Sequence, residues 1–472
     1  MNVYDCLTIS SLTDKYMKLE GAYDGVYEVQ GNLRAYIAEA VYGGRVSVNK
    51  KYQKKIVEGK ISDYDGVSLY PSAINRLCRE KGLSKGKAKR FNKEDLTNWK
   101  DKTYSIMTVK ITKVNKKQQM PFIAQKEAEE SIKYINTIPD KSLIIDSITL
   151  QDYIDFHEIE YELLEGIYWD EGGNDTMGKV IQRLFNARLQ AKKDGKKALS
   201  NTIKLMLNSA YGKTMIKKSK QEKVIVKTHK YTKQGNKWVK QEETNLNNYI
   251  YNNFNTIKSY RKLNDECYEI ERIKADDSYN RGHIGCAILS TSKRIMNEVF
   301  NVANDNEYPI YYTDTDSLHC KLEDVEKLEA KYKERYNKEL NGKQLEQFHT
   351  DFELLDKDGN ARQGKNEEIY AIKSIFLGKK SYIDVLESKD ENGKTINGYH
   401  IRLKGITKEG LEDQAKKYKN SYLGLYEDLS KGKEIEITLN PFNKDENKQR
   451  VMFDFKNGKV FTKKEFKRKV KF

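Results

Sequence analysis

Residues 309–318 read Pro-Ile-Tyr-Tyr-Thr-Asp-Thr-Asp-Ser-Leu, and this stretch decides the fold. Apolar and aromatic residues on both sides of Asp314-Thr315-Asp316 predict two short strands around a tight turn. Residues two apart in an extended chain point the same way, so both carboxylates leave one face of the hairpin. Two acids this close repel each other unless a cation lies between them. The pattern therefore indicates a divalent-cation site, although a polar hairpin tip would show the same three residues.

A third acid, Asp65, stands at the end of another predicted strand. Residues 59–69 predict a short strand that runs into a turn, and Pro71 then permits a helix to begin. Mg²⁺ prefers oxygen ligands from one or two carboxylates together with substrate phosphates. Acids on two strands could therefore hold two ions about 3.5–4 Å apart for in-line phosphoryl transfer. Asp63 shares a face with Asp65, so it either contacts a metal ion or is a partly exposed acid.

Two helices are predicted between the acidic strands. Apolar residues recur at intervals of three to five from residue 178 to 191, which is typical of an amphipathic helix. An Asp-Gly pair within residues 192–197 ends that helix, and a second helix is predicted over 198–213. The two would form an antiparallel pair with a basic tip. A further helix is expected over 284–302, whereas residues 214–280 are rich in Lys, Asn, Gln and Tyr and hold candidate hairpins.

The composition favours a phosphate-binding protein. The chain has 472 residues, a length that predicts several subdomains, and its formal net charge is +16. A basic surplus of this size suits a nucleic-acid surface, although a lysine-rich proteome would give the same value. No apolar run reaches the roughly 18 residues that a membrane span needs, and the N-terminus lacks the regions of a signal peptide. We therefore expect a cytoplasmic protein with no membrane partner.

The cysteines and histidines show no metal-ligand pattern. None of the 5 cysteines stands at zinc or CxxC spacing, so they are expected to be reduced core residues. No two of the 6 histidines form a ligand pair along the sequence, and they are interpreted as ordinary side chains. The histidines occur at positions 157, 229, 283, 319, 349 and 400.

Three separate stretches resemble the motifs of family B DNA polymerases. Residues 65–72, Asp-Gly-Val-Ser-Leu-Tyr-Pro-Ser, match the family motif DxxSLYPS. Residues 204–212 match KxxxNSxYG, and residues 312–317 match YxDTDS. One such match would be weak, but three in the family's order are very specific, so the chain is identified as a member of this family. The resemblance covers about residues 5–410.

Within family B, the chain resembles the protein-primed branch, the replicases of small tailed phages, adenoviruses and linear plasmids. Residues 376–382 resemble the KxY element of that branch, and residues 402–407 resemble the entrance to its thumb. Residues 43–45, Gly-Gly-Arg, resemble its YxGG element, with Val41 where the family usually has Tyr. The resemblance implies template-directed DNA synthesis, with DNA template and primer, deoxynucleoside triphosphates and a terminal (priming) protein as partners.

The resemblance implies an α+β right hand with an antiparallel palm sheet, helical fingers, two insertions and a small thumb. We expect the palm to begin in residues 1–75, followed by the first insertion and palm elements in 76–178, the fingers in 179–213, the second insertion in 214–282, the rest of the palm in 283–403 and the thumb in 404–472. Only a short segment precedes the acidic strand, where proofreading relatives carry an exonuclease domain. That domain is therefore expected to be missing, as a separate exonuclease subunit or through truncation.

By the resemblance, Asp65 and Asp316 would bind two Mg²⁺ ions, with Mn²⁺ as an alternative. Val67 would be a further metal ligand, and Asp314 would be an auxiliary catalytic acid. The nucleotide-binding residues would be Ser68, Leu69, Tyr70, Arg188, Lys192, Lys204, Asn208 and Tyr211. The DNA-binding residues would be Gly43, Gly44, Gly212, Thr315, Lys380, Tyr382, Arg402 and Lys404.

The helical residues of this set share a face. Lys204, Asn208 and Tyr211 fall at i, i+4 and i+7, so they could meet the triphosphate, the template base and the nascent base pair together. On the preceding helix, Lys192 is favoured over Arg188 for a triphosphate contact, although either could be a solvated side chain.

The remaining predicted contacts concern the sugar, the primer and the DNA backbone. Tyr70 would lie under the sugar of the incoming nucleotide, where its ring leaves no room for a 2′-hydroxyl. Lys380 and Tyr382 alternate on a predicted strand, so they would share a face and grip the primer terminus. Gly43 and Gly44 would let the backbone approach DNA closely, although a plain turn would also use them.

Three rival functions are left open by the sequence. The first is a primer-independent polymerase of the same branch. The second is a reverse transcriptase, which is disfavoured because the turn reads Asp-Thr-Asp in place of two adjacent acids. The third is a non-catalytic DNA-binding subunit of a split replicase, which would be free to lose the acids that this chain retains.

Overall fold

The computed structural model describes residues 8–127, 131–215, 221–234, 237–254, 257–273, 280–354, 369–390, 392–418, 421–439, 452–456, 459–463 and 467–472. The helices are α1 (Ile9–Leu19), α2 (Gly31–Glu39), α3 (Leu69–Glu80), the 3-10 helix η2 (Leu96–Asp101), α4 (Ser147–His157), α5 (Thr176–Lys193), α6 (Lys197–Thr214), α7 (Asn245–Asn253), α8 (Gly282–Asp305), α9 (Leu322–Tyr336), α10 (Lys408–Lys417) and α11 (Tyr422–Ser430). The strands in the first half are β1 (Val46–Val48), β2 (Ile56–Gly66), β3 (Leu83–Ser84), β4 (Lys89–Arg90), β5 (Tyr104–Val114), β6 (Ile123–Lys126), β7 (Ile132–Ile135), β8 (Leu143–Asp146), β9 (Ile159–Trp169), β10 (Gly173–Asn174), β11 (Gln221–Lys227) and β12 (His229–Gln234). Those in the second half are β13 (Lys237–Thr244), β14 (Ile257–Lys262), β15 (Cys267–Ile273), β16 (Ile310–Asp314), β17 (Ser317–Lys321), β18 (Phe348–Thr350), β19 (Tyr370–Gly378), β20 (Ser381–Lys389), β21 (Thr395–Leu403), β22 (Ile435–Thr438), β23 (Met452–Lys456), β24 (Lys459–Lys463) and β25 (Lys467–Val470).

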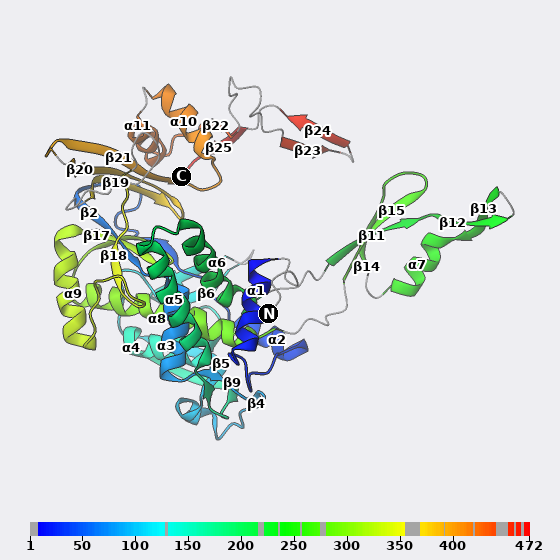
Figure 1. The fold of residues 1–472 in the computed structure, drawn as a ribbon, viewed down its shortest axis with the longest axis horizontal. Coiled ribbons are helices and arrows are strands. Elements are labelled where there is room, and N and C mark those ends of the chain that lie inside the picture. The colour runs from blue at the N-terminus through cyan, green and yellow to red at the C-terminus, as the bar shows by residue number, and fades with distance from the viewer. Residues whose placement is uncertain are drawn as a thin grey trace.

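A large antiparallel sheet carries both predicted acidic segments. Its strands run in the order β1-β16-β17-β2-β19-β20-β21, and β18 pairs with the end of β2. The strands β16 and β17 are the two predicted around the acidic turn, and β2 contains the strand predicted before Asp65. The sheet is curled. The ring centroid of Tyr382 on β20 lies 4.8 Å from that of Tyr312 on β16, although other strands separate β20 from β16 in the sheet. The structure thus has the predicted α+β class with an antiparallel sheet (Figure 1).

Strand β2 leads almost directly into α3, as the sequence predicts. The strand ends at Gly66 and the helix begins at Leu69, with Ser68 between them in the left-handed region at φ 49°. Pro71 lies in the first turn of α3, where its missing N–H breaks no helical hydrogen bond. The apolar face of α3 packs against α5 and α8, which ties the end of β2 to the helical core.

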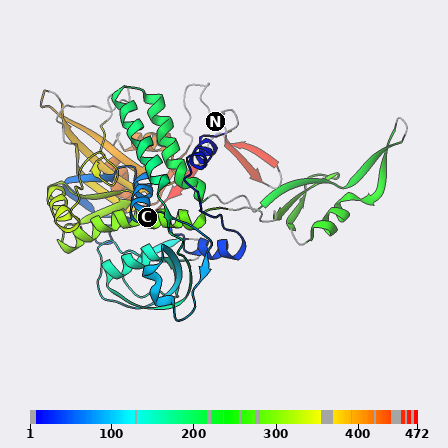
Figure 2. The same cartoon turned by 60° about the horizontal axis from the view of Figure 1, so that its bottom comes forward.

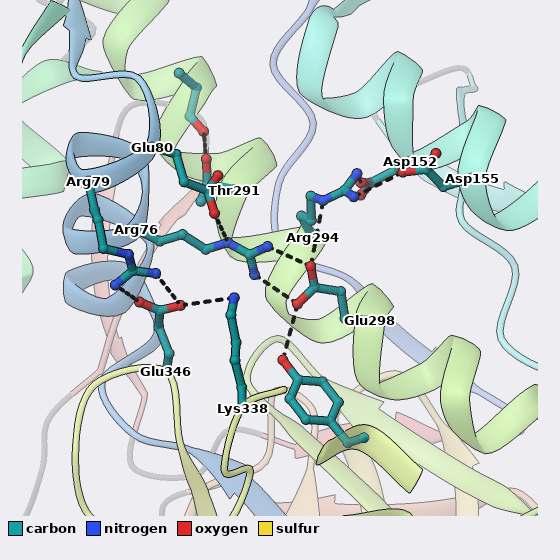
Figure 3. A network of polar contacts seen from close by, with 12 residues as sticks. Arg76, Arg79, Glu80, Asp152, Asp155, Thr291, Arg294, Glu298, Lys338 and Glu346 are labelled. Atoms are coloured by element: carbon teal, nitrogen blue, oxygen red, sulfur yellow. Dashed lines mark hydrogen bonds and ion pairs between the residues drawn. The ribbon is translucent and has the colours of Figure 1, made fainter. Parts of the chain in front are cut away.

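A buried ion-pair network holds α3 against its neighbours (Figure 3). Both terminal nitrogens of Arg76 on α3 donate to Glu298 on α8, at 2.8 and 2.5 Å. Tyr332 on α9 donates to the same carboxylate at 3.1 Å. Arg294 on α8 lies 3.7 Å from Glu298 and pairs with Asp152 on α4 at 2.7 Å. The network therefore joins four helices, among them the one that follows the acidic strand β2.

The three longest predicted helices are present, each slightly longer than predicted. They are α5, α6 and α8, and the link between the first two contains Gly195 at φ 70°, where glycine is favoured. Figure 1 shows α5 and α6 packed side by side, beside α3. The predicted antiparallel pair with a basic tip is therefore found.

A second sheet lies on the other side of α8. Its strands run in the order β4-β9-β5-β8, and α4 packs between this sheet and α8. Figure 2 shows it, in cyan, apart from the large sheet. One continuous apolar core runs from β5 and β9 through α8 to α3, so this sheet is built into the body of the protein.

Residues 221–273 form an arm that projects from the body in both views (Figures 1 and 2). Strands β11, β15 and β14 form a three-stranded antiparallel sheet, and β12 and β13 form a hairpin beside α7. The Lys- and Tyr-rich composition of this segment fits an exposed location, since the arm buries little apolar surface against the body. The arm lies within the segment predicted to be the second insertion.

The C-terminal lobe covers one face of the β19–β21 hairpins. Helices α10 and α11 and the β22–β25 pair form its base, and Leu425 and Leu429 on α11 are fully buried against Ile375 and Ile383 of the sheet. Figure 1 shows this lobe above β21, far from the β5–β9 sheet. The lobe follows the last strand of the large sheet and lies within the segment predicted to be the thumb, an assignment that stays a prediction.

Two further expectations can be compared with the described residues. Within them, no helix combines the length and the apolar character needed to cross a membrane. Cys78, Cys286 and Cys320 are buried free thiols and Cys267 is half-buried, as expected of core cysteines, whereas Cys6 lies outside the described residues.

Candidate active site

Asp65 and Asp316 lie next to each other at the ends of two paired strands. Strand β2 pairs with β17 so that Asp65 is opposite Ser317. The N–H of Gly66 donates to the carbonyl oxygen of Asp316 at 2.8 Å. Two acids from distant parts of the sequence therefore meet at one edge of the sheet, while each remains half-buried and open to the site.

The turn that carries Asp316 is strained and closely packed. Thr315 has a φ of 68°, in the left-handed region that β-branched residues rarely adopt. Its N–H donates to the carbonyl oxygen of Arg45 at 2.8 Å. A Cβ on Gly44 would lie 2.7 Å from the Thr315 side chain, so glycine is required for this close approach. The loop containing Gly43, Gly44 and Arg45 therefore braces the acidic turn, which gives Gly44 a packing role besides its predicted DNA contact.

Burial and mutual repulsion disfavour the charged forms of the two acids. Burial, and then the charges of Asp316 and Asp351, raise the pKa of Asp65 to about 9. Burial and then the charge of Asp314 raise the pKa of Asp316 to about 6. Lys380 pairs with Asp314, and in the part of the chain that the structure describes no ion pair neutralises Asp65 or Asp316. A cation between them would offset both the repulsion and the lost hydration.

Asp314 has a different environment. Lys380 donates to both of its carboxylate oxygens, at 3.0 and 3.1 Å. The prediction that Lys380 and Tyr382 alternate on one strand is wrong, because Lys380 lies in the β19–β20 turn at φ 57° and β20 begins at Ser381. Tyr382 is buried against Tyr312. Lys380 is therefore beside the acidic turn, and the contact of either residue with a primer terminus stays a prediction.

A fourth carboxylate, Asp351, was not identified from the sequence. It follows β18, which pairs with β2 so that His349 is opposite Asp65. The N–H of Asp351 donates to the carbonyl oxygen of Asp63 at 2.9 Å. Burial is the largest cause of the raised pKa values of Asp65 and Asp316, and the charge of Asp351 is one of the smaller causes. The side chain of Asp351 therefore lies near the same site. The signal in the sequence is weak, an acid directly after three strand-forming residues.

The turn between β2 and α3 connects the acids to α5. The hydroxyl of Ser68 accepts a hydrogen bond from Arg188 at 3.1 Å. The carbonyl oxygen of Val67 accepts one from the Ser72 hydroxyl at 2.7 Å, which leaves it one lone pair for a metal ion. Leu69 is buried, so only its backbone is available to a nucleotide. Ser68 and Arg188 thus contact each other beside the acids, while their nucleotide contacts and Val67 as a metal ligand stay predictions.

Helices α5 and α6 present cations toward the acids. Against the effect of burial, the charge of Lys204 acts to lower the pKa of Asp65, so the ammonium lies close to that carboxyl. Burial, and then the charges of Arg188 and Lys204, lower the pKa of Lys192. Lys343, in the loop after α9, adds to this effect and was not identified from the sequence. These like charges face one another, an arrangement that a bound triphosphate would stabilise.

Two tyrosines, one on α3 and one on α6, stack beside the acids. The rings of Tyr70 and Tyr211 stack, with centroids 4.5 Å apart and planes 6° apart. Burial and then the charge of Asp316 raise the pKa of Tyr70, so its hydroxyl lies near the acidic pair. Asn208 and Gly212 are exposed on α6, and nothing lies within 4 Å of the Cβ position of Gly212. The predicted face of α6 is therefore open beside the stacked rings.

The donor set of the acidic cluster fits Mg²⁺. It consists of the carboxylates of Asp65 and Asp316, with Asp351 as a neighbouring charge, and Mg²⁺ prefers such hard oxygen ligands together with substrate phosphates. The first two acids have raised pKa values, so a divalent ion would displace protons from them. These residues could hold the ions, and α5 and α6 supply cations for the phosphates.

Comparison with known proteins identifies the family. A family model described as DNA polymerase type B, organellar and viral, matches residues 1–334, more than two thirds of the chain. The chain belongs to this family. It is a DNA-directed DNA polymerase, as the three motifs had indicated. No curated protein matches this polymerase in sequence.

Solved structures of the phi29 DNA polymerase share the fold of this polymerase. An orthorhombic crystal form is 15% identical at a TM-score of 0.62, and the match covers 98% of this chain and 67% of that chain. A ternary complex with primer-template DNA and incoming nucleotide substrates is 14% identical at a TM-score of 0.59, with 98% and 67% covered. A complex with single-stranded DNA is 15% identical at 0.59, with the same coverage. At these identities the likeness shows the fold alone, and it confirms the predicted family B architecture.

Two predicted DNA contacts of the polymerase lie at the entrance to the C-terminal lobe. Arg402 and Lys404 are exposed at the end of β21. The backbone of each is held in place, since the Tyr426 hydroxyl donates to the carbonyl oxygen of Arg402 at 2.8 Å and the N–H of Lys404 donates to the Ser381 hydroxyl at 3.2 Å. Both side chains are exposed, and the Arg402 guanidinium also donates to the carbonyl oxygen of Ile401 at 3.2 Å, so their contact with a phosphate backbone stays a prediction.

Proposed function

We propose that this polymerase adds deoxynucleotides to a primer 3′-hydroxyl on a DNA template by two-metal phosphoryl transfer. The observation that carries the proposal is the meeting of Asp65 and Asp316, unneutralised by any described cation and facing the basic helices α5 and α6. Two Mg²⁺ ions, when bound, would lower the pKa of the primer hydroxyl and neutralise the triphosphate and the leaving pyrophosphate. Asp65 and Asp316 would hold them, and the charge of Asp351 would add to the negative potential at the ions.

The chain's own residues would bind and orient the nucleotide. Lys192, Lys204 and Arg188 would contact the triphosphate, because their charges are gathered opposite the acids. The ring of Tyr70 would lie under the sugar and exclude a 2′-hydroxyl, which selects deoxynucleotides. Tyr211, with which it stacks, would contact the nascent base pair, where base–ring stacking is independent of sequence.

We further propose that the polymerase acts in protein-primed replication of a phage, virus or linear plasmid. The support is the likeness of the fold to phi29 polymerase, and we assign the first insertion with palm elements to residues 76–178 and the second insertion to residues 214–282. We extend to this chain the primer-template DNA and the incoming nucleotide that the phi29 ternary complex contains. A terminal protein and a separate exonuclease subunit are proposed as partners, with palm, fingers and thumb divided as the sequence predicts.

Primer extension tests the proposal. We expect the wild-type protein to extend a primed single strand with Mg²⁺ or Mn²⁺, and Asp316→Asn to be inactive in both. Asp170→Asn serves as a matched control, because Asp170 pairs with Lys89 at the surface of the second sheet. Equal activity of the wild type and Asp316→Asn would contradict the assignment of the acids. Extension of an unprimed strand, by contrast, would favour the primer-independent alternative.

A further inference from the structure

A second group of ionisable side chains lies inside the curled sheet, apart from the nucleotide-facing acids. Strand pairing places His319 on β17 opposite Asp63 on β2, and the curl of the sheet brings His400 on β21 to the same point. One ligand atom from each of the three lies within 4.8 Å of the others. Asp63 was expected to be partly exposed or to contact the catalytic metal, but it is 7% exposed and faces the histidines. The interpretation of all six histidines as ordinary is therefore wrong for His319 and His400.

The atoms that face one another in this group have no hydrogen-bond partner. They are Oδ1 of Asp63, Nδ1 of His319 and Nδ1 of His400, all of them buried. Buried polar atoms are almost always satisfied, so three unsatisfied atoms within one group of side chains need an explanation. The Oδ1 of Asp63 lies 3.4 Å from Nδ1 of His319. Two ligands bound at about 2.1 Å to a tetrahedral zinc ion lie about 3.4 Å from each other, so this separation leaves room for a shared ion.

The other ring nitrogen of His319 is held by a carboxylate. Nε2 donates to Oδ2 of Asp384 on β20 at 3.2 Å, and Oδ1 of Asp384 accepts from the Ser374 hydroxyl at 2.6 Å. A proton on Nε2 leaves the lone pair of Nδ1 directed at the group with Asp63. This carboxylate–histidine arrangement is the one that orients histidine ligands in metal sites. The same Oδ2 of Asp384 lies 3.3 Å from Nδ1 of His400, so this carboxylate borders the group on the side of both histidines.

We propose that Asp63, His319 and His400 bind a divalent transition-metal ion, with zinc as the best match. Two imidazoles and one carboxylate suit zinc and its neighbours and do not suit Mg²⁺, so this site would be distinct from the catalytic one. A dication balances the charges of Asp63 and Asp384, which are both buried in the sheet. A water molecule or the second oxygen of Asp63 would complete the fourth position. His400 is 25% exposed, which provides an entry path from solvent.

The ion would join three strands of the large sheet directly below the catalytic acids. Asp63 is two residues from Asp65 on β2, and His319 is three residues from Asp316 along β17. Fixing β2 to β17 and both to β21 would hold the two catalytic carboxylates at a constant separation. The site is therefore assigned a positioning role, and its residues are not expected to touch substrate.

The competing arrangement has no metal. Burial alone would lower the pKa of His319, but the charges of Asp63 and Asp384 outweigh it and raise that pKa to about 9. A protonated His319 could then bridge the two acids as an ion pair. That arrangement predicts a hydrogen bond from Nδ1 to Asp63, whereas the structure leaves both atoms without one.

Zinc binding by the full chain separates the two arrangements. The protein is stripped with a chelator, returned to buffer containing Mg²⁺, and titrated with ZnCl₂ against a chromophoric zinc chelator. We expect about one tightly bound zinc per chain in the wild type and in Asp65→Asn/Asp316→Asn, and at least a tenfold loss of affinity in His400→Ala. His229→Ala is the matched control, because His229 lies on the arm, and it should bind as the wild type does.

A cobalt spectrum gives a second readout that needs no variant. Co²⁺ in place of zinc should give the visible absorption of a four-coordinate site in the wild-type protein, and this absorption should be absent in His400→Ala. A far-UV circular dichroism spectrum confirms that His400→Ala is folded. A wild-type protein that binds no zinc, or binds it equally well after His400→Ala, would overturn the proposal in favour of the protonated bridge. Loss of zinc in the Asp65→Asn/Asp316→Asn protein would also overturn it, since the metal would then belong to the catalytic acids.

Discussion

Glu298 and Asp65 are both carboxylates of the protein core, but their surroundings differ. The Glu298 side chain is 2% exposed and accepts two hydrogen bonds from Arg76 and one from Tyr332 (Figure 3). Burial, and then the charges of Asp316 and Asp351, raise the pKa of Asp65, and the charge of Lys204 on α6 offsets only a small part of that effect. A buried acid that is matched by arginine holds helices together. An acid that is left with other acids is available to bind an ion, and this is the difference between the scaffold and the site.

Removing the acids of the site should have the largest effect on activity. In Asp65→Asn/Asp316→Asn we expect nucleotide incorporation to fall by at least about 1,000-fold, since two-metal catalysis contributes several kcal/mol. The thermal midpoint should stay equal or rise, because the substitution removes the repulsion between two half-buried acids. Single-nucleotide incorporation and a thermal melt in the absence of Mg²⁺ measure the two effects. A lower melting temperature with activity retained would mean that Asp65 and Asp316 stabilise the fold and do not act in the site.

Removing the matched acid should act on stability. Glu298→Gln leaves Arg76 buried without its full partner, so we expect a loss of about 3–5 kcal/mol in the free energy of unfolding. The control is Glu162→Gln on the second sheet, where an exposed pair with Lys110 should contribute less than about 1 kcal/mol. Urea unfolding followed by circular dichroism compares them. Equal effects of the two substitutions would mean that the network in Figure 3 does not hold the helices.

Buried histidines that have no acidic partner should make the stability of the protein depend on pH. Burial lowers the pKa of His157 to about 4 and that of His283 to about 3. As the pH falls below about 6.5, these histidines take up protons in the unfolded chain before they do in the folded protein. The free energy of unfolding should therefore decrease by about 2 kcal/mol for each histidine between pH 7 and pH 5. Urea midpoints at pH 7, 6 and 5 measure this. His283→Phe keeps the ring that stacks 4.7 Å from Trp169 and should flatten the dependence, whereas an unchanged slope would exclude His283 as its source.

The basic face opposite the acids should give the smallest effect. Lys192→Ala removes one of several cations directed at the triphosphate, so we expect the KM for the nucleotide to rise about tenfold, with kcat changed less. Lys193→Ala is the matched control, because the next residue lies about 100° further round the helix. Steady-state kinetics with varied nucleotide separates the two variants. An equal rise in KM for both would point to a general charge effect in place of a directed contact.

Much of the site was predictable because its geometry is local. The alternation of an extended chain and a two-residue turn place Asp314 and Asp316, and the 3.6-residue period of a helix places Lys204, Asn208 and Tyr211 on one face. The prediction from the sequence was wrong where the direction of a side chain depends on the residue at which its strand begins. Lys380 was expected on a strand with Tyr382, but the β19–β20 turn takes it out of that alternation and toward Asp314.

Other residues of the site depend on pairing between distant segments. Asp351 reaches the acids because β18 adds to the end of β2, a register that no local pattern encodes. Glu298 meets Arg76 across 222 positions of the chain through the packing of α3 on α8. His319 and His400 converge because the sheet curls. In each case the sequence around the residue gives no sign of its distant partner, so the residue resembles an ordinary charged or polar side chain.

The amino-acid order was enough to predict a cation site at the acidic turns, the helical face opposite them and membership in family B, since each depends on residues within a few positions of one another. Which acids share a cation, which are matched by arginine, and which histidines meet a buried carboxylate were settled by strand register and helix packing. Those contacts form only when the chain closes over long distances, and their free energy belongs to the assembled core and to no single segment.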